Sequence, residues 1–279
     1  MTAAAADDPA FAALTAKIAR ERGFGAGSYR DGCLRRRIAV RMRARGVPDY
    51  AAYSHLLDAD PAEWEPLLDA LTINVTKLFR DRDVYAALAR DVIPAVWDMR
   101  APAAGGPDTV RVWSAGCASG EEPYSLAALF HRHATARGEA GRLGRLRIVA
   151  SDIDRASLER ARRAEYPESA FGDTPDDLRS RYFTRGLPAT VLPEVRALVT
   201  FETRDLLSDP APRGPLQMIT CRNVVIYFDA ASQQGLFQRF HDALQPGGYL
   251  VLGKVETLLG PARQLFEAID HRHRIFRRP

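Results

Sequence analysis

A glycine-containing turn between a predicted strand and a predicted helix is the first place to look for chemistry. The stretch VWSAGCASGEEPYSLA, residues 112–127, runs from apolar residues through Gly116 and Gly120 into a helix that begins near Glu121. Unpaired N–H groups and the helix dipole favour a phosphate at such a turn. The stretch lacks the Lys-Ser/Thr pair of a phosphate-binding loop, however, and its glycines do not fit G-x-G-x-x-G. A triphosphate or a dinucleotide therefore fits poorly.

Two carboxylates at the start of the predicted helix narrow the choice of ligand. Glu121 and Glu122 would repel a phosphate and would favour a ligand that offers hydroxyls, amines or positive charge. S-adenosylmethionine offers all three. The alternative is that the two glutamates only open a helix ahead of Pro123, and this stretch alone does not separate the two interpretations.

Polar residues also follow two further predicted strands. Asp152 ends the run LRIVASD, where an acid can accept hydrogen bonds from ribose hydroxyls; the alternative is a helix N-cap, for which Asp154 is better placed. Arg222, Asn223 and Tyr227 follow the run LQMITC, and polar groups beside an apolar strand need partners. Asn223 either contacts the amino acid part or the adenine edge of a cofactor, or is a structural turn residue.

The elements that would hold these side chains alternate between strands and helices. Apolar runs at 110–116, 146–152, 216–221 and 248–253 are separated by helical patterns. This alternation predicts an α/β fold with a parallel sheet covered by helices, in which the ligand lies across the carboxyl ends of the strands. The stretch 181–204 is rich in proline and β-branched residues and predicts a small antiparallel β insertion.

The N-terminal part of the chain predicts a separate all-helical unit. From residue 10 to about 90, helical patterns are punctuated by Gly and Pro, and no strand pattern occurs. The predicted helix within 29–46 carries two stripes, an apolar one of Leu34, Ile38 and Met42 and a cationic one of Arg37, Arg41 and Arg45. A basic helix is more often a solvated face or a nucleic-acid contact than a docking surface, but this one lacks the interleaved aromatic residues of a nucleic-acid binder.

Composition excludes several classes of protein. With 279 residues and 46% hydrophobic content, the chain can form one large domain or a large domain with a small appendage. It has no run of about 18 apolar residues, and its start has no basic segment, so we expect no membrane insertion, no secretory signal and a cytoplasmic location. Cys33, Cys117 and Cys221 are far apart, so we expect neither a disulfide framework nor a metal site.

With these pieces in place, the chain resembles the CheR family, the chemotaxis protein-glutamate methyltransferases that use S-adenosylmethionine. Four motifs carry the resemblance in the family's order: LTINVTKLFRD at 71–81, similar to the family's N-x-T-x-F-F-R signature, VWSAGCASGEEPYS at 112–125, ASDID at 150–154 and CRNVVIYFD at 221–229. The basic helix also matches that family's N-terminal domain.

The resemblance implies a fold and a domain organisation. It implies a Rossmann-like methyltransferase domain with a mostly parallel sheet over residues 91–279, with a small β-subdomain inserted near 181–204. It also implies an all-helical N-terminal domain over residues 1–90. The inserted subdomain resembles one that captures a receptor's C-terminal peptide in some members of the family.

The resemblance also implies the residues of the site. The residues that the resemblance places around the cofactor are Asn74, Thr76, Arg80, Gly116, Glu122, Asp152, Asp205, Leu206, Arg222 and Asn223. Arg80 and Tyr227 are the implied catalytic residues. Arg80 would clamp either the methionine carboxylate of the cofactor or the substrate glutamate, and Tyr227 would lie near the sulfonium.

Some positions depart from the family's pattern. Asp205 stands where the family usually has Asn, and Leu78 replaces the first Phe of the Phe-Phe pair. Lys254 and Val255 stand where the family commonly has the His and Ser of G-H-S-E, while Glu256 matches it. Any role of that His and Ser does not carry over to this chain.

The implied function is methyl transfer from S-adenosylmethionine to glutamates of a chemoreceptor, which tunes signalling adaptation. The receptor's cytoplasmic helical bundle is acidic in the family picture, so Arg37, Arg41 and Arg45 would dock along it. We expect a monomer with no nucleic-acid partner. The alternatives are a methyltransferase of the same fold that acts on another protein or a small molecule, and a signalling module that binds the cofactor without catalysis.

Overall fold

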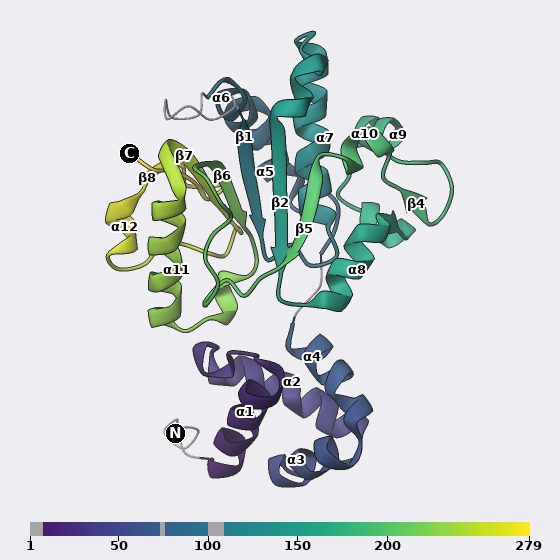
Figure 1. Ribbon diagram of the computed structural model, residues 1–279, viewed down its shortest axis with the longest axis vertical. Coiled ribbons are helices and arrows are strands. Elements are labelled where there is room, and N and C mark those ends of the chain that lie inside the picture. The colour runs from purple at the N-terminus through teal and green to yellow at the C-terminus, as the bar shows by residue number, and fades with distance from the viewer. Residues whose placement is uncertain (1–7, 73–75, 100–108) are drawn as a thin grey trace. The chain divides into compact units, whose positions relative to one another are not determined.

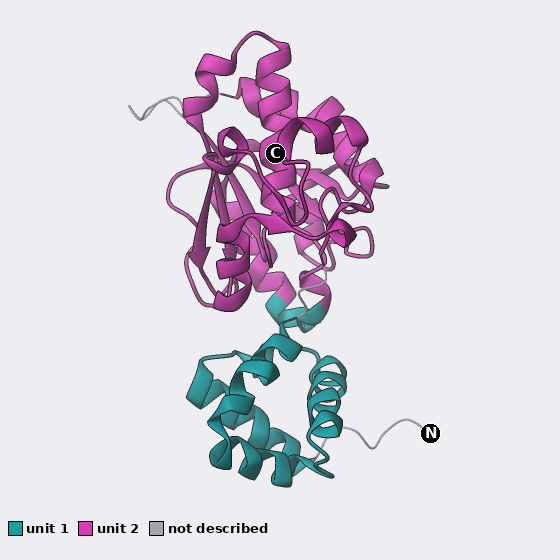
Figure 2. Cartoon of the chain, turned by 90° about the vertical axis from the view of Figure 1, so that its right-hand side faces the viewer, with its two compact units in different colours: residues 1–73, 227–232 teal, residues 74–226, 233–279 magenta. Residues whose placement is uncertain are grey.

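The structure is a computed structural model that describes residues 8–72, 76–99 and 109–279 (Figure 1). The chain divides into two compact units, which are described separately here (Figure 2). The helical unit comprises residues 1–73 and 227–232, and the sheet unit comprises residues 74–226 and 233–279.

The boundary between the units differs from the sequence-based expectation. The pattern predicted that the helical unit extends to about residue 90, but residues 74–90 belong to the sheet unit. Val84, Tyr85 and Leu88 are helical, but they lie buried in the core of the sheet unit. Their helical pattern looked continuous with the preceding helices because periodicity reports the local conformation and not the core that the apolar face joins.

The helical unit consists of short helices that begin and end at capping residues. Asp8 caps the first helix by accepting a hydrogen bond from the N–H of Ala10 at 3.0 Å, and Gly23 ends that helix with a φ of 67°. The apolar faces meet in a core that includes Leu14, Ile18 and Ile38, so the predicted helical unit is confirmed. Its helices are α1 Pro9–Arg22, α2 Asp31–Ala44, α3 Tyr50–Ala59 and α4 Trp64–Leu71.

A short segment from far along the chain completes the helical unit. Tyr227–Ser232 clusters with the helices of the first 73 residues. The N–H of Arg30 donates to the Tyr227 carbonyl at 2.9 Å, and the rings of Tyr29 and Phe228 lie 5.0 Å apart. The helical unit is therefore built from two separate stretches of sequence.

A buried carboxylate holds α2 to the rest of the helical unit. Glu63 is 1% exposed, and its two oxygens accept hydrogen bonds from Arg41 at 2.9 and 2.8 Å. Arg45 and the Tyr53 hydroxyl each donate to the same carboxylate at 2.8 Å, and Arg45 also donates to Asp60 at 2.8 Å. Burial alone would raise the pKa of Glu63, but these hydrogen bonds hold it below its usual value.

Glu63→Gln is expected to lower the free energy of unfolding of the helical unit by about 3 kcal/mol, because it leaves two arginines facing a neutral amide. Urea denaturation followed by far-UV circular dichroism measures the change. Asp60→Asn is the matched control, since Asp60 is more exposed, and it should cost less than about 1 kcal/mol. Because the pKa of Glu63 is depressed, this stabilisation is present above the usual Glu pKa of 4.5 and is lost as the pH falls below it. The Glu63→Gln protein should not show this loss. Equal stability of wild type and Glu63→Gln would contradict this account.

The sheet unit is built on a seven-stranded sheet in the order β5-β2-β1-β6-β7-β9-β8 within the described residues. Parallel pairing joins β5, β2, β1, β6 and β7, and antiparallel pairing adds β9 and β8. This confirms the predicted α/β fold with a mostly parallel sheet. The strands are β1 Val110–Ala115, β2 Leu146–Asp152, β5 Val199–Thr203, β6 Leu216–Cys221, β7 Leu244–Leu252, β8 Glu267–Asp270 and β9 Ile275–Arg277.

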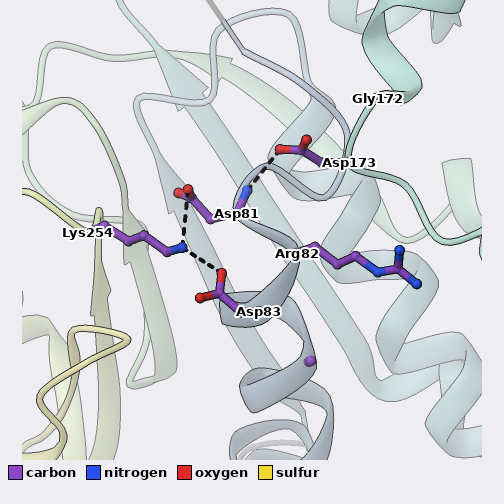
Figure 3. Close-up of a pocket in the computed structure, with 7 residues that line it drawn as sticks. Asp81, Arg82, Asp83, Gly172, Asp173 and Lys254 are labelled. Atoms are coloured by element: carbon purple, nitrogen blue, oxygen red, sulfur yellow. Dashed lines mark hydrogen bonds and ion pairs between the residues drawn. The ribbon is translucent and has the colours of Figure 1, made fainter.

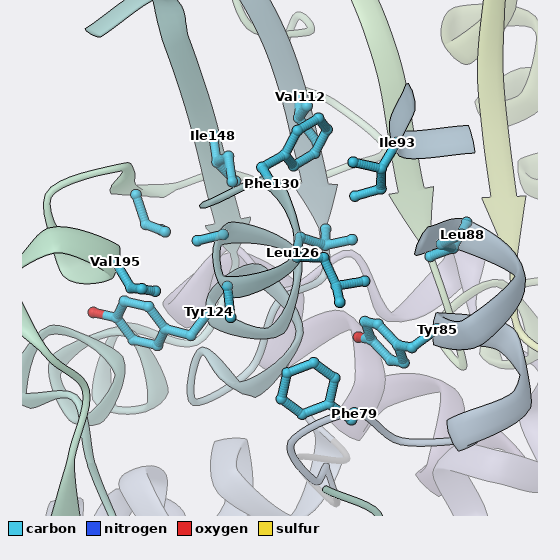
Figure 4. Packing of buried hydrophobic residues seen from close by; sticks show 14 of the residues in the cluster. Phe79, Tyr85, Leu88, Ile93, Val112, Tyr124, Leu126, Phe130, Ile148 and Val195 are labelled. Carbon is cyan, nitrogen blue, oxygen red and sulfur yellow. The ribbon is translucent and has the colours of Figure 1, made fainter. Parts of the chain in front are cut away.

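Helices cover both faces of this sheet. On one face Val112 and Ile148 pack with Phe130 of α7, in the core shown in Figure 4. On the other face Trp113 packs edge-on against Phe240 of α11, with ring centroids 5.5 Å apart. The helices of this unit are α5 Arg82–Ala87, α6 Ile93–Asp98, α7 Glu121–Ala136, α8 Arg155–Arg163, α9 Asp176–Tyr182, α10 Pro193–Arg196, α11 Ala230–Ala243, whose first residues belong to the helical unit, and α12 Ala262–Leu265.

The β insertion expected at 181–204 is smaller and differently bounded than that stretch. It is a two-stranded antiparallel pair, β3 Glu165–Tyr166 with β4 Ala189–Thr190. Val199–Thr203, the last part of the expected insertion, is instead the parallel edge strand β5 of the main sheet, paired with β2. Its V-T-F-E-T alternation looked like an exposed antiparallel strand because an edge strand is partly open to solvent.

Candidate active site

The turn after β1 approaches its neighbours too closely for residues other than glycine. Gly116 and Gly120 have φ values of 79° and 91°. A Cβ on Gly116 would lie 2.5 Å from Cγ2 of Val224, and a Cβ on Gly120 would lie 2.9 Å from Cβ of Ala161. The N–H groups of Gly116 and Cys117 both donate to the Ser151 carbonyl, at 2.8 and 3.0 Å. These contacts fix the turn against the carboxyl end of β2.

Asp152 ties this turn to β2 through its carboxylate. One oxygen accepts the N–H of Ala118 at 2.8 Å, and the other accepts the N–H of Asp154 at 3.0 Å. The residue is only 9% exposed, and burial raises the pKa of its carboxyl. The cap of α8 is Asp154, which accepts the Ala156 N–H at 2.9 Å, so Asp152 is not that cap. Each Asp152 oxygen still has a lone pair for a further donor.

Glu122 lies between the carboxyl ends of β1 and β6. Its Oε1 accepts hydrogen bonds from the hydroxyls of Ser114 at 2.8 Å and Thr220 at 2.6 Å. Its Oε2 lies 3.8 Å from Nη1 of Arg222. Glu121 points elsewhere and accepts the Ser119 hydroxyl, and burial raises the pKa of the Glu121 carboxyl. Of the two glutamates, Glu122 is the one that faces the strand ends.

Arg222 joins the end of β6 to the segment that contains Arg80. Its side chain is 3% exposed, and its Nη2 donates to the Arg80 carbonyl at 2.9 Å and to the Asp81 carboxylate at 2.8 Å. Its guanidinium also lies over the ring of Tyr85, 5.3 Å from the centroid. Arg222 thus brings Arg80 and Glu122, which are distant in sequence, to one place in the sheet unit.

The backbone around Arg80 and Asn223 has a conformation that most residues avoid. Phe79, Asp81, Ala118 and Asn223 have φ values of 53°, 63°, 46° and 62°. The N–H of Phe79 donates to the Ser125 hydroxyl at 2.9 Å, and that of Asp81 donates to Asp173 at 3.1 Å. Such strained residues gather at binding and catalytic sites, where surrounding contacts hold them in place.

Two buried polar atoms at this place have no partner within the described residues. They are Nε of Arg222 and Oδ1 of Asn223. Buried polar atoms nearly always have a partner, so this donor and this acceptor are available to a ligand that offers the complementary groups. Together with the carboxylates of Glu122 and Asp152, they fit S-adenosylmethionine, which carries ribose hydroxyls, an amino acid part and a positive charge.

The loop after β5 lies beside Asp152. The N–H of Arg204 donates to the Asp152 carbonyl at 2.9 Å. The Asp205 carboxylate accepts the Leu207 N–H at 2.8 Å, and Arg239 of α11 donates to the Leu206 carbonyl at 2.9 Å. The structure therefore places Asp205 and Leu206 at the same edge of the sheet as Asp152.

A pocket of about 630 Å³ opens next to the Arg80 segment (Figure 3). Lys254, which stands where the family commonly has His, lies at this pocket with its ammonium 2.7 Å from Asp83 and 3.7 Å from Asp81. In this chain Lys254 therefore pairs with acids beside the site. The pocket is lined by Asp81, Arg82, Asp83, Ala86, Gly172, Asp173 and Lys254.

Several expected site residues are not placed with this group. Asn74 lies outside the described residues, and Thr76 is half-buried at the start of the next described stretch. Tyr227 belongs to the helical unit, so its expected position near the sulfonium stays a prediction.

Two of the three arginines expected to dock the receptor form ion pairs inside the helical unit. Arg41 and Arg45 bind Glu63 and Asp60 within the helical unit, so their charges are already neutralised. Arg37 is half-buried, and its Nε has no acceptor among the described residues. The exposed arginines of α2 are Arg36 and Arg43, which lie two helical turns apart.

Other residues of the site were not expected from the sequence. Ser114, Thr220 and Asp81 bind Glu122 or Arg222 directly. The sequence does carry a weak signal for them. Ser114 and Thr220 are hydroxyl residues in otherwise apolar strands, and Asp81 directly follows Arg80 in the LTINVTKLFRD motif. In the part of the chain that the structure describes, no helix is long and apolar enough to cross a membrane, and no cluster of side chains has the composition of a metal site.

Two protein families match the chain over most of its length. Residues 74–275 match the family described as "CheR methyltransferase, SAM binding domain". Residues 9–72 match the family described as "CheR methyltransferase, all-alpha domain". The two matches meet where the first stretch of the helical unit ends, at residues 72–74.

Curated proteins are similar over nearly the whole chain. A chemotaxis protein methyltransferase of Listeria innocua is 33% identical over 251 residues, which cover 89% of this chain and 90% of that protein. One from Escherichia coli K12 is 33% identical over 262 residues, 91% of this chain and 86% of that protein. An uncharacterized 104.1 kDa protein of Rhodobacter capsulatus is 42% identical over 250 residues, which are 89% of this chain but only 25% of that longer protein.

Proposed function

This chain belongs to the CheR family of S-adenosylmethionine-dependent methyltransferases, and on that premise we propose that it methylates glutamate side chains of a chemoreceptor. The enzyme class and the cofactor follow from the family. The relatives named chemotaxis protein methyltransferases support the receptor as substrate. The observation that carries the proposal is the pair of unpaired buried atoms, on Arg222 and Asn223, beside two carboxylates at the strand ends.

We propose specific roles for the residues at the strand ends. Asp152 accepts hydrogen bonds from the ribose, and Glu122 accepts them from the amino acid part or the ribose. Asn223 and Arg222 use their unpaired atoms toward the same ligand, and Asp205 and Leu206 flank the adenine. Gly116 lets the turn after β1 pack closely on the loop after β6, because a side chain there would clash with Val224.

The transfer itself needs alignment more than proton chemistry. S-adenosylmethionine supplies a methyl group on a positively charged sulfur when it is bound. A glutamate side chain is already ionised at pH 7, so no general base is required. Alignment of the two reactants can contribute about 7–11 kcal/mol, and a drier site weakens the solvation of charges that cancel during transfer. Arg80 is proposed to hold one of the two carboxylates, and Tyr227 to orient the sulfonium end.

One experiment separates the proposed function from its alternatives. The protein is incubated with methyl-labelled S-adenosylmethionine and receptor cytoplasmic fragments, and the label is tested for release by base. Base-labile label on glutamates supports the proposal, since methyl esters are base-labile. Base-stable label, or label only on other molecules, would favour a different acceptor. Binding of S-adenosylhomocysteine without methylation of any glutamate-bearing partner would favour a non-catalytic module.

We further propose that the exposed arginines of α2, Arg36 and Arg43, together with Arg37 of the same helix, dock the acidic receptor. Arg36→Glu with Arg43→Glu should slow receptor methylation about tenfold at low salt, because reversed charge opposes steering of an acidic partner. The wild-type rate should fall with added salt, and affinity for S-adenosylhomocysteine should not change.

The matched control for this docking surface is Arg20→Glu, on the exposed side of α1 in the same unit. It should leave the methylation rate near that of the wild type. A double variant on α2 that methylates the receptor at the wild-type rate would refute the docking role. We also predict a monomer in the cytoplasm, and size-exclusion chromatography with light scattering tests the oligomeric state.

A further inference from the structure

A second buried carboxylate lies where β7 ends next to the end of β6. Glu256 is 3% exposed. Its carboxylate accepts hydrogen bonds from the N–H groups of Gly253 at 2.6 Å, Val224 at 2.8 Å, Asn223 at 2.9 Å and Ile226 at 3.3 Å. It therefore gathers backbone donors from two loops around one charge.

The loop after β7 approaches the loop after β6 so closely that residue 253 must be glycine. A Cβ on Gly253 would lie 2.7 Å from Oε2 of Glu256 and 2.8 Å from the backbone nitrogen of Asn223. A real side chain would push the carboxylate or the loop away. The contact between Glu256 and the residues after β6 thus depends on two residues of the loop after β7, the carboxylate of Glu256 and the missing side chain of Gly253.

The residue that this carboxylate holds is in a strained conformation and carries the unpaired acceptor. Asn223 has a φ of 62°, and Glu256 accepts its N–H and that of the next residue. Oδ1 of Asn223 is buried without a partner among the described residues, as is Nε of the adjacent Arg222. A turn whose only task was to connect β6 to the next helix would gain nothing from burying these atoms unpaired.

We propose that Glu256 is a positioning residue that holds Arg222 and Asn223 in the conformation that receives the cofactor. This inference rests on the proposed function, because it takes the cofactor as the ligand of those two side chains. Glu256 does not touch the cofactor in this account. It acts through the backbone of Asn223 and Val224, in the way that outer groups orient the residues that bind a ligand.

The test is the affinity of the full chain for S-adenosylhomocysteine, measured by calorimetry on folded protein. Glu256→Gln keeps the size of the side chain but turns an amide N–H toward backbone donors, so the loop loosens. Affinity should fall about 10- to 100-fold, the range found when groups that orient metal ligands are replaced. Glu63→Gln is the control, since it makes the same change at a buried carboxylate of the helical unit, and it should leave this affinity within about twofold of the wild type.

A double-mutant cycle separates positioning from general destabilisation. Asn223→Gly keeps the positive φ at no strain and removes the side chain. If Glu256 acts by positioning Asn223, the double variant loses clearly less affinity than the product of the two single losses. Losses that multiply would overturn the proposal, as would wild-type affinity in Glu256→Gln.

Gly253→Ala is the second variant, should Glu256→Gln not fold. It disturbs the same contact from the opposite side, and it should also weaken binding at least about tenfold. Normal affinity in a folded Gly253→Ala protein would overturn the proposal. Failure of the wild type itself to bind S-adenosylhomocysteine would be a different result, because it would contradict the proposed function rather than the role of Glu256.

Discussion

Replacing Arg80 with lysine is expected to lower the rate of methyl transfer about 100-fold while the protein stays folded. Lysine keeps the charge but loses the planar pair of donors that holds a carboxylate, and a shift of about 1 Å in a reacting group costs about that factor. The backbone here should not change, because the Arg80 carbonyl binds Arg222 and the flanking Phe79 and Asp81 are held by Ser125 and Asp173. Single-turnover methylation of a receptor fragment measures the effect.

Binding data decide which carboxylate Arg80 holds. If it holds the methionine carboxylate of the cofactor, affinity for S-adenosylhomocysteine falls in step with the rate. If it holds the substrate glutamate, that affinity stays and turnover is lost. Arg90→Lys is the control in the same unit, since Arg90 is exposed and pairs with Asp91. Normal rate and normal affinity in Arg80→Lys would mean that Arg80 has no part in the chemistry.

Asp152→Asn is expected to weaken the binding of S-adenosylhomocysteine about 10- to 100-fold, or about 1.5–3 kcal/mol. The amide loses one acceptor oxygen, so it cannot serve the ribose, the Ala118 N–H and the Asp154 N–H together. From the sequence alone we would expect a change at Asp152 to leave the fold intact. The structure shows that the same carboxylate fixes the turn after β1, so the melting temperature should fall as well.

The neighbouring acid provides the control for Asp152. Asp154→Asn keeps a good helix cap and should bind S-adenosylhomocysteine with normal affinity. Burial raises the pKa of Asp152, so its carboxylate becomes protonated at a pH above the usual Asp pKa of 3.8. As the pH is lowered, the affinity of the wild type for S-adenosylhomocysteine should therefore begin to fall before pH 3.8 is reached. Affinity should increase with pH until Asp152 is ionised and stay constant above that. Unchanged affinity in Asp152→Asn would sink the ribose assignment.

The parts of the fold that sequence could predict are those set by local pattern. Strands β1, β2, β6 and β7 are apolar runs between helical patterns, and each was expected close to its place in the structure. Their order in a parallel sheet then brings Asp152, Glu122 and Asn223 to one edge by topology alone. The candidate site was accessible from sequence because its residues follow strands.

The parts that could not be predicted depend on partners distant in sequence. The spacing of Arg41 and Arg45 shows a cationic stripe, but only the fold brings Glu63 against it. The motif shows Glu256, but not that it gathers backbone donors from the loop after β6. Strand β5 was missed because its pattern matches an exposed strand, and its place in the main sheet is decided by pairing with β2.

The division of the helical unit into two stretches of sequence has a consequence for how such proteins can be recombined. Residues 1–73 cut out alone would lack Tyr227 and Phe228, which pair with Arg30 and Tyr29. A transplant of either half into another protein would therefore leave an aromatic surface exposed. The whole chain should instead behave as one exchangeable cassette. In the 104.1 kDa relative the similar region is 250 residues long, more than residues 74–279 alone, so the similarity extends into both units.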